Sequence, residues 1–229
     1  MSKTALIAAV ERLDLPTARQ LLRRTPSLRS VVDRQGRNLL HLACSVPPLK
    51  RGPSEAAQSR TVAFLLDEGF EVDLPMGRDH CTPLFFAVAR ARNLALVKLL
   101  LARGAKVNAA PGGGLFAAGW WQDLKILEVL LDAGARIDVV VGVTPFLACW
   151  GWQRFDAAKF LAKKGADVNV RDQKGKTALH HGVEKEFDPA QLAWLVDHGA
   201  SPDTKDKSGV SARDRASRKR DKRFLDALA

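Results

Sequence analysis

Five histidines and three cysteines are the side chains of this 229-residue sequence that could act as nucleophiles, general bases or metal ligands. His80 and Cys81 are adjacent, but no partner motif for a catalytic pair accompanies them. His180 and His181 have only Glu184 nearby, which leaves too few ligands for a zinc site. We therefore expect no catalytic residue, no metal and no cofactor. A reactive thiol at Cys81 is the one enzymatic alternative.

A run of three glycines, Gly112 to Gly114, has the composition of a phosphate-binding loop. Such a loop needs a downstream G-K-[ST] and a turn from strand to helix, and neither is present. The run therefore predicts a shortened turn whose backbone passes close to a neighbouring segment.

Composition describes a basic globular protein: 36 Lys plus Arg face 25 Asp plus Glu, the formal net charge is +11, and 46% of residues are hydrophobic. This apolar content excludes disorder for most of the chain. No run approaches the ~20 apolar residues of a membrane-spanning helix, and the N-terminus lacks the apolar core of a secretory signal. The cysteines show no C-x-x-C spacing, which suits a reducing compartment. We expect no membrane contact and a cytoplasmic location.

An internal repeat runs along the sequence. Gly-Ala pairs, each followed by an apolar and then an acidic or amide residue, recur at Gly104, Gly134, Gly165 and Gly199. A second block recurs at Asn38 to Ala43, Thr82 to Ala87, Thr144 to Cys149 and Thr177 to Gly182, with Gly113 to Ala118 as a degraded copy, and from Thr82 onward it lies about twenty residues before a Gly-Ala pair. A period of this length is typical of repeat architectures.

The second block matches the T-P-L-H-x-A pattern of the ~33-residue ankyrin repeat, and the blocks from Thr82 onward begin 31 to 34 residues apart. The chain resembles the ankyrin-repeat family, and looks like a bacterial stand-alone member. The resemblance implies an all-α ankyrin-repeat solenoid of about seven helix-turn-helix repeats with short β-hairpin fingers. We expect a single domain over residues 1–229, whose N-terminal cap, five internal repeats and C-terminal cap start near Thr4, Asn38, Thr82, Gly113, Thr144, Thr177 and Ser211.

The best-defined repeat can also be interpreted from its residues alone. Thr177 is a good N-cap for a short helix to about Glu184, and residues 189–197 place apolar side chains at helical spacing. Gly199 then predicts a left-handed helix end. The second repeat departs from the pattern, because about ten extra residues within Ser45 to Ser59 separate its two helices.

The resemblance gives several polar and small residues a structural role. His41 and His180 occupy the histidine position of the block, where the family uses the ring to hydrogen-bond backbone of a neighbouring turn. Cys44 and Cys149 fall where the family places small alanines, so we expect them to fill the core.

Four tryptophans are the strongest candidates for a binding site. In this family the fingers and first helices line a concave face, and Trp120, Trp121 and Trp152 fall at positions of the first helix that contact partners in designed ankyrin binders. Trp150 stands one position earlier, at a site that is normally small and packed. Tryptophan dominates the energy of many interfaces. The alternative is that these rings fill space left by shortened fingers, and this alternative is favoured for Trp150.

Basic residues flank these tryptophans on the proposed face, namely Arg78, Arg90, Arg171, Lys174, Lys176 and Lys185. An apolar centre with basic surroundings suits an acidic protein partner. We therefore expect a non-enzymatic protein-protein interaction module, monomeric when free, that acts as an inhibitor, immunity protein or adaptor.

Nucleic acid or another polyanion is the alternative partner, bound through the terminal repeats. Residues 11–37 carry seven arginines against three acids, and residues 205–223 carry nine Lys plus Arg against three. Basic runs of this kind contact phosphates readily. Acidic residues interrupt the C-terminal run, however, as they do on an ordinary solvated helix face.

Overall fold

Helix pairs make up the chain in the computed structural model, which describes residues 3–47, 54–77, 80–110, 113–219 and 221–229. The pairs are α1 (Lys3–Glu11) with α2 (Leu15–Arg24), α3 (Leu39–Cys44) with α4 (Glu55–Asp67), α5 (Pro83–Phe86) and its π-helical continuation η2 (Ala87–Ala91) with α6 (Leu94–Ala102), α7 (Gly113–Trp121) with α8 (Leu124–Asp132), α9 (Pro145–Gly151) with α10 (Phe155–Lys163), α11 (Ala178–Glu184) with α12 (Pro189–Asp197), and α13 (Ala212–Lys219) with α14 (Lys222–Ala227). A short 3-10 helix, η1 (Pro26–Ser30), follows α2. The seven predicted repeats and the all-α fold are confirmed.

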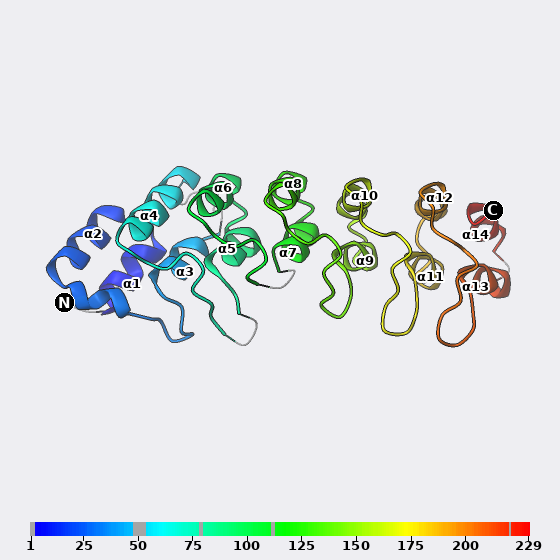
Figure 1. Ribbon diagram of the computed structural model, residues 1–229, viewed down its shortest axis with the longest axis horizontal. Helices are drawn as coiled ribbons and strands as arrows, with labels where there is room; N and C mark the ends of the chain where they lie inside the picture. The colour runs from blue at the N-terminus through cyan, green and yellow to red at the C-terminus, as the bar shows by residue number, and fades with distance from the viewer. Residues whose placement is uncertain (1–2, 48–53, 78–79, 111–112, 220) are drawn as a thin grey trace. The chain divides into compact units, whose positions relative to one another are not determined.

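Two compact units divide these pairs: an N-terminal unit of residues 1–118 and 125–135, and a C-terminal unit of residues 119–124 and 136–229. In the N-terminal unit, α1, α3 and α5 pack in succession and α4 packs against α6. In the C-terminal unit, α9, α11 and α13 also pack in succession, and α12 packs against α14 (Figure 1). Each unit is therefore a stack of two helical layers. The expected single domain over residues 1–229 stays a prediction.

The starts of α3, α5, α9 and α11 follow from the repeated block. Asn38 accepts a hydrogen bond from the backbone N–H of His41 at 2.9 Å, and Thr144 accepts one from Leu147 at 3.3 Å. These side chains satisfy backbone donors that a helix N-terminus leaves unpaired. Pro145 stands at the first helical position, where its missing N–H costs nothing.

The ends of α6, α8, α10 and α12 follow from the Gly-Ala pair. Gly165 has φ 101° and Gly199 has φ 87°, in the left-handed region that a side chain makes costly. After Gly199, the N–H of Ala200 returns to the carbonyl of Leu195 at 2.9 Å and closes the helix end. The predicted glycine ends are confirmed.

In the described residues, the turns inside five of the seven pairs use a left-handed residue that is not glycine. Such residues stand at Leu13, Arg92, Gln122, Gln153 and Glu186. At Gln153 (φ 59°) the turn is closed by the N–H of Arg154, which donates to the carbonyl of Cys149 at 2.8 Å. A one-residue reversal of this kind fixes where the last side chain of the first helix points.

Loops called fingers here precede the first helices, and in the described residues each is closed by at most one isolated antiparallel bridge, as at Val141–Val143 and Lys205–Ser211. Asp172 organises finger 171–176 by accepting the N–H groups of Lys174 (2.8 Å) and Lys176 (2.9 Å). The predicted hairpins are thus minimal turns, and in finger 171–176 the turn is held by an aspartate.

The extra residues of the second repeat are partly helical. α4 begins at Glu55, so the last part of the predicted Ser45 to Ser59 insertion is its first turn, and residues 48–53 lie outside the described residues. Gln58, on this turn, is buried and donates to the carbonyls of Ala43 (2.9 Å) and Val46 (3.1 Å). The inserted segment is therefore tied back onto α3.

A glycine allows α7 and α9 to approach closely in the C-terminal unit. A Cβ atom placed on Gly119 would lie 2.3 Å from the Sγ of Cys149. Carbon and sulfur atoms cannot approach to that distance without displacement. The small residue in α7 is therefore a condition for this packing.

Candidate partner-binding site

Trp150 belongs to the core. Its side chain is 0% exposed and packs between Phe146 and Phe155, with ring centroids 6.2 and 5.1 Å away. Phe155 continues the aromatic contacts to Phe187 at 5.3 Å. The prediction of Trp150 as a contact residue is therefore wrong, because no part of the ring reaches the surface. The space-filling alternative holds for this residue.

Trp120 and Trp152 meet at the surface of the C-terminal unit, where they are 42% and 39% exposed. Their rings lie edge to face with centroids 5.2 Å apart, and the Arg154 guanidinium lies 4.8 Å from the Trp120 centroid. Lys185 reaches the same place from α11, donating to the carbonyl of Gly151 at 2.8 Å. We call Trp120, Trp152, Arg154 and Lys185 the tryptophan cluster.

The local sequence explains why these rings remain exposed. Trp121 is the last residue of α7 and Trp152 directly follows α9, so each stands beside the left-handed residue that reverses the chain. Side chains at such a reversal lie at the end of the helix rather than between layers. Trp121, 44% exposed, lies next to the cluster in sequence. Three of the four predicted tryptophans are thus accessible, and each is large enough to anchor a partner.

Arg154 was not among the predicted site residues. It lies in the turn before α10, outside the positions that the repeat pattern marks, and no motif identifies it. The useful signal is its distance of two residues from Trp152, since arginine often stacks on tryptophan. Its Nε is buried without a hydrogen-bond partner in the described structure.

The predicted basic residues are distributed over more than one place. Arg78 lies outside the described residues. Arg90 is exposed on η2 in the N-terminal unit, whereas the tryptophan cluster belongs to the C-terminal unit. Arg171 is engaged by the fingers themselves, because its guanidinium donates to the carbonyls of Gly175 and Lys205. Only Lys185 of the predicted bases is part of the tryptophan cluster.

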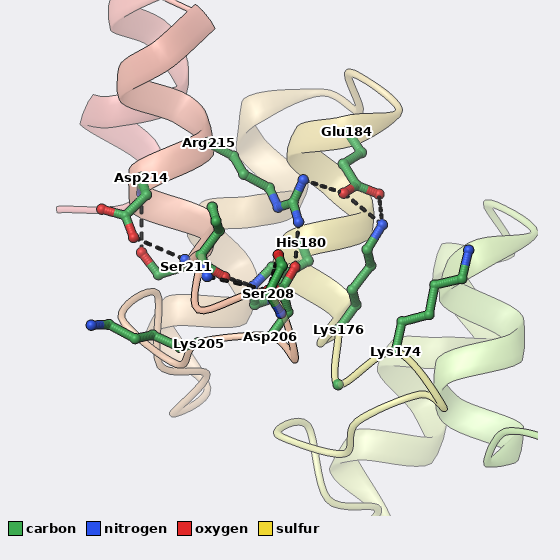
Figure 2. A network of polar contacts seen from close by, with 12 residues as sticks. Lys174, Lys176, His180, Glu184, Lys205, Asp206, Ser208, Ser211, Asp214 and Arg215 are labelled. Carbon is green, nitrogen blue, oxygen red and sulfur yellow. Dashed lines mark hydrogen bonds and ion pairs between the residues drawn. The ribbon is translucent and has the colours of Figure 1, made fainter.

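Lys176 is part of a chain of charges between the last two repeats (Figure 2). Its ammonium lies 2.7 Å from a carboxylate oxygen of Glu184, which also receives the Arg215 guanidinium at 2.7 Å. Arg215 pairs in turn with the buried carboxylate of Asp206. A hydrogen bond from the Ser208 hydroxyl, against the opposing effect of burial, holds the pKa of Asp206 well below its ordinary value, and the contact with Arg215 assists. Much of the charge on Lys176 is therefore satisfied internally.

The histidines have the structural role that the resemblance implies. His180 accepts the N–H of Thr177 at its Nδ1 (3.1 Å), so its Nε2 donates to the carbonyl of Val210 at 3.0 Å. The Nε2 of His41 likewise lies 2.8 Å from the carbonyl of Leu74. Both rings bridge a first helix to the following finger.

None of the three cysteines forms a disulfide in the described structure, and Cys44 and Cys149 are buried. Burial raises the pKa of Cys149 to about 12 and raises that of Cys44 further. Such thiols are neutral and unreactive near neutral pH. Cys81 is half-buried. Among the residues that the structure describes, no group of three or more His, Cys, Asp or Glu is arranged to hold a metal ion.

The basic residues near the two ends of the sequence differ in whether they form ion pairs. Exposed arginines without an ion pair in the described structure gather at the start of the chain, namely Arg12, Arg19, Arg23 and Arg24. Near the C-terminus the bases pair with nearby acids instead, as Arg213–Asp203 (2.8 Å), Lys219–Glu186 (2.6 Å) and Arg223–Asp221 (2.7 Å). In the described part of the chain, no helix is long and apolar enough to cross a membrane.

Comparison with known proteins agrees with this architecture. A family model for ankyrin repeats in three copies matches residues 115–206, and a model for a single ankyrin repeat matches residues 79–110. Together these segments cover more than half of the 229 residues.

Two curated relatives match a short part of the chain. It is 46% identical over 55 residues to an ankyrin repeat-containing protein of Treponema pallidum (strain Nichols), and 38% identical over 55 residues to an ankyrin repeat protein of Acanthamoeba polyphaga mimivirus. Each match covers 24% of this chain, but only 18% and 13% of those proteins.

Solved structures resemble this chain over nearly its whole length. The ankyrin repeat domain of Bcl-3, a member of the IkappaB protein family, has a TM-score of 0.80 and 22% identity, with 98% of this chain and 97% of that chain covered. The human ASB11 ankyrin repeat domain has a TM-score of 0.75 and 25% identity, with 97% and 95% covered. These are likenesses of fold. The chain belongs to the ankyrin-repeat family, whose repeats generally mediate protein-protein interaction.

Proposed function

We propose that this chain is a non-enzymatic module that binds a partner protein through the tryptophan cluster and Trp121. The observation that carries the proposal is the exposure of three tryptophans, 39% to 44% each, at the ends of two successive first helices. Exposed tryptophan is uncommon on a free surface, whereas buried tryptophan supplies much of the energy of protein interfaces. The paired, edge-to-face arrangement of Trp120 and Trp152 also limits the freedom that binding would remove.

The bases of the cluster favour an acidic partner. Neither Arg154 nor Lys185 forms an ion pair with a carboxylate in the part of the chain that the structure describes; one lies over a ring and the other on a carbonyl. A carboxylate on the partner would therefore form an ion pair with Arg154 or Lys185 beside the exposed tryptophan rings. Complementary charges of this kind speed encounter and select the partner.

The test compares Trp120→Ala/Trp152→Ala with Trp194→Ala. Trp194 is a half-buried tryptophan of α12 in the same unit, so it controls for loss of an aromatic ring. Each folded variant is used to capture proteins from a lysate of the source organism, and the captured partner is then titrated. We expect the double variant to lose at least tenfold in affinity and Trp194→Ala to retain it, because interface tryptophans commonly contribute more than about 2 kcal/mol. Equal affinities for the two variants would refute the proposed site.

Polyanion binding is the second candidate, and the unpaired arginines of the N-terminal unit favour it. Arg19, Arg23 and Arg24 line one shallow groove of about 550 Å³ on α2, together with Gln20. Affinity for single- or double-stranded nucleic acid should then fall steeply with salt concentration and fall again in Arg19→Gln/Arg23→Gln. Binding that depends on the tryptophan cluster but not on salt would reject this candidate.

A cytoplasmic location and a free monomer are further proposals. The cysteines form no disulfide bond in the described structure, which supports a reducing compartment. Light scattering on the purified chain tests the oligomeric state, and fractionation of the source cells tests the location. Stoichiometric tight binding to one captured protein would support an inhibitor or immunity role, whereas weaker binding to several would support an adaptor.

A further inference from the structure

One finger of the C-terminal unit has an apolar tip. In finger 139–143, Val140 is 70% exposed and Val141 is 52% exposed. The corresponding tips of other described fingers are polar, namely Arg34-Gln35-Gly36, Gln173-Lys174-Gly175 and Lys207-Ser208-Gly209. The side chains of these two valines are mostly exposed, and apolar side chains in such a place are the type of residue that a partner would cover.

Finger 139–143 is also short, and this leaves the following finger, 171–176, uncovered on that side. Only six positions lead from Asp138 to Thr144, against eight from Asn169 to Thr177. The two long fingers that follow are joined, since the N–H of Lys207 donates to the carbonyl of Lys174 at 3.0 Å. In the described residues no such bond joins finger 139–143 to finger 171–176. A groove of about 420 Å³ lies between them instead.

The two sides of this groove differ in chemistry. Val141 and Val143 form an apolar side, while Lys174 and Lys176 stand on the opposite finger, where the Lys176 ammonium is already paired with Glu184. Figure 2 shows the Lys174 side chain extending away from the charge network, and its ammonium has no ion pair in the described structure. Asp172, the carboxylate of the lining, accepts the backbone N–H groups of Lys174 and Lys176 and forms no ion pair with the Lys174 ammonium.

His181 and Asp172, both in the lining of the groove, form a polar pair. The Nε2 of His181 lies 3.1 Å from Asp172, which orients the ring toward the finger. Burial keeps the pKa of His181 below its ordinary value despite the nearby carboxylate, so the ring adds no charge at neutral pH. The groove therefore presents an apolar side and a positive side.

We propose that this groove binds an extended acidic segment of the partner protein in which apolar and acidic residues alternate. Successive side chains of an extended chain point to opposite sides, so a segment lying between the fingers directs its apolar residues to the valines and its carboxylates to Lys174. The inference rests on the proposed protein-binding function and names the chemistry of the partner. It assigns finger residues a role separate from that of the tryptophan cluster.

The experiment titrates the labelled chain with a capped peptide of sequence Gly-Leu-Glu-Leu-Glu-Gly, followed by nuclear magnetic resonance. We expect amide shifts concentrated at residues 139–143 and 171–176. Lys174→Gln should weaken binding two- to fivefold, roughly the contribution of one exposed ion pair, and Val141→Ser should weaken it to a similar extent. Lys222→Gln removes the same charge from an exposed site on α14 in the same unit and should leave the affinity unchanged.

Several results would overturn the inference. They are no binding at millimolar peptide, equal binding of the peptide with glutamines in place of glutamates, and an equal loss in Lys222→Gln. Failure of the groove proposal can be distinguished from failure of the proposed function. Partner capture lost in Trp120→Ala/Trp152→Ala, with peptide affinity indifferent to Lys174, would reject the groove alone. Capture that ignores the tryptophans, with peptide affinity dependent on Lys174, would reject the cluster alone.

Discussion

Replacing Gly119 by alanine should destabilise the C-terminal unit, although alanine is normally the better helix former. The new methyl group would lie 2.3 Å from the Sγ of Cys149, well inside the ~3.5–4.0 Å at which such atoms make contact. Cys149 is fully buried in α9, so its thiol cannot move out into solvent. Either the two helices must separate or the thiol must leave its rotamer.

The expected magnitude follows from two opposing terms. Alanine gains about 1 kcal/mol over glycine inside a helix, while forcing an extra methyl group into a packed core costs about 1–3 kcal/mol. Because the clash at Gly119 involves a buried, short side chain, we expect a cost near the upper limit and a net loss of about 2 kcal/mol. Gly151 provides the matched control. It lies in α9, and a Cβ there meets no heavy atom within 4 Å, so Gly151→Ala should stabilise the protein by about 0.5–1 kcal/mol.

Urea denaturation followed by circular dichroism measures both variants. The double variant Gly119→Ala/Cys149→Ala adds the decisive comparison, since removal of the thiol should relieve the clash. We expect a favourable coupling of about 1–2 kcal/mol between the two substitutions. Gly119→Ala at or above wild-type stability would refute the reasoning, and so would a penalty that persists without the thiol.

Three more predictions concern burial and titration. Trp150→Ala should lose about 3–5 kcal/mol of stability in urea titrations, as for other buried aromatics, whereas Trp152→Ala should lose less than about 1 kcal/mol. Iodoacetamide should label Cys81 but not Cys149 in the folded protein, with peptide mass spectrometry as the readout, because burial keeps the latter protonated. Burial raises the pKa of Asp172, but hydrogen bonds from the finger backbone and His181 outweigh this and lower it overall. Its stabilisation should thus be present at neutral pH and disappear as pH falls below about 4, so urea midpoints of wild type and Asp172→Asn should converge there. A constant gap between those midpoints would contradict this assignment.

The repeated elements could be predicted because their signals are local. A capping residue such as Thr144 and a glycine such as Gly165 each determine a helix boundary within a few residues of themselves, and their spacing then gives the period. Minimal fingers and the left-handed turn at Gln153 carry no comparable composition signal. They result from the geometry of reversing the chain between packed helices.

The candidate site was predictable only in part, because the exposure of a side chain depends on how the packed helices cover it. Trp150 and Trp152 are two positions apart and share a residue type, yet Trp150 is buried against Phe146 and Phe155 whereas Trp152 stays exposed. Pairing of the bases likewise depends on acids far along the chain, and no sequence window reveals it. Arg154 was missed for the same reason.

The charge network between the last two repeats has a consequence for how the chain comes apart. The sequence of α13, Ala-Arg-Asp-Arg-Ala-Ser-Arg-Lys, offers little apolar surface, and the attachment of its Arg215 to Asp206 and Glu184 is largely ionic. Added salt screens partly exposed ion pairs of this kind and weakens them. Amide exchange in α13 and α14 should therefore accelerate with added salt while that of α11 does not. How firmly α13 is held against α11 would then be set by the ionic strength of the surroundings.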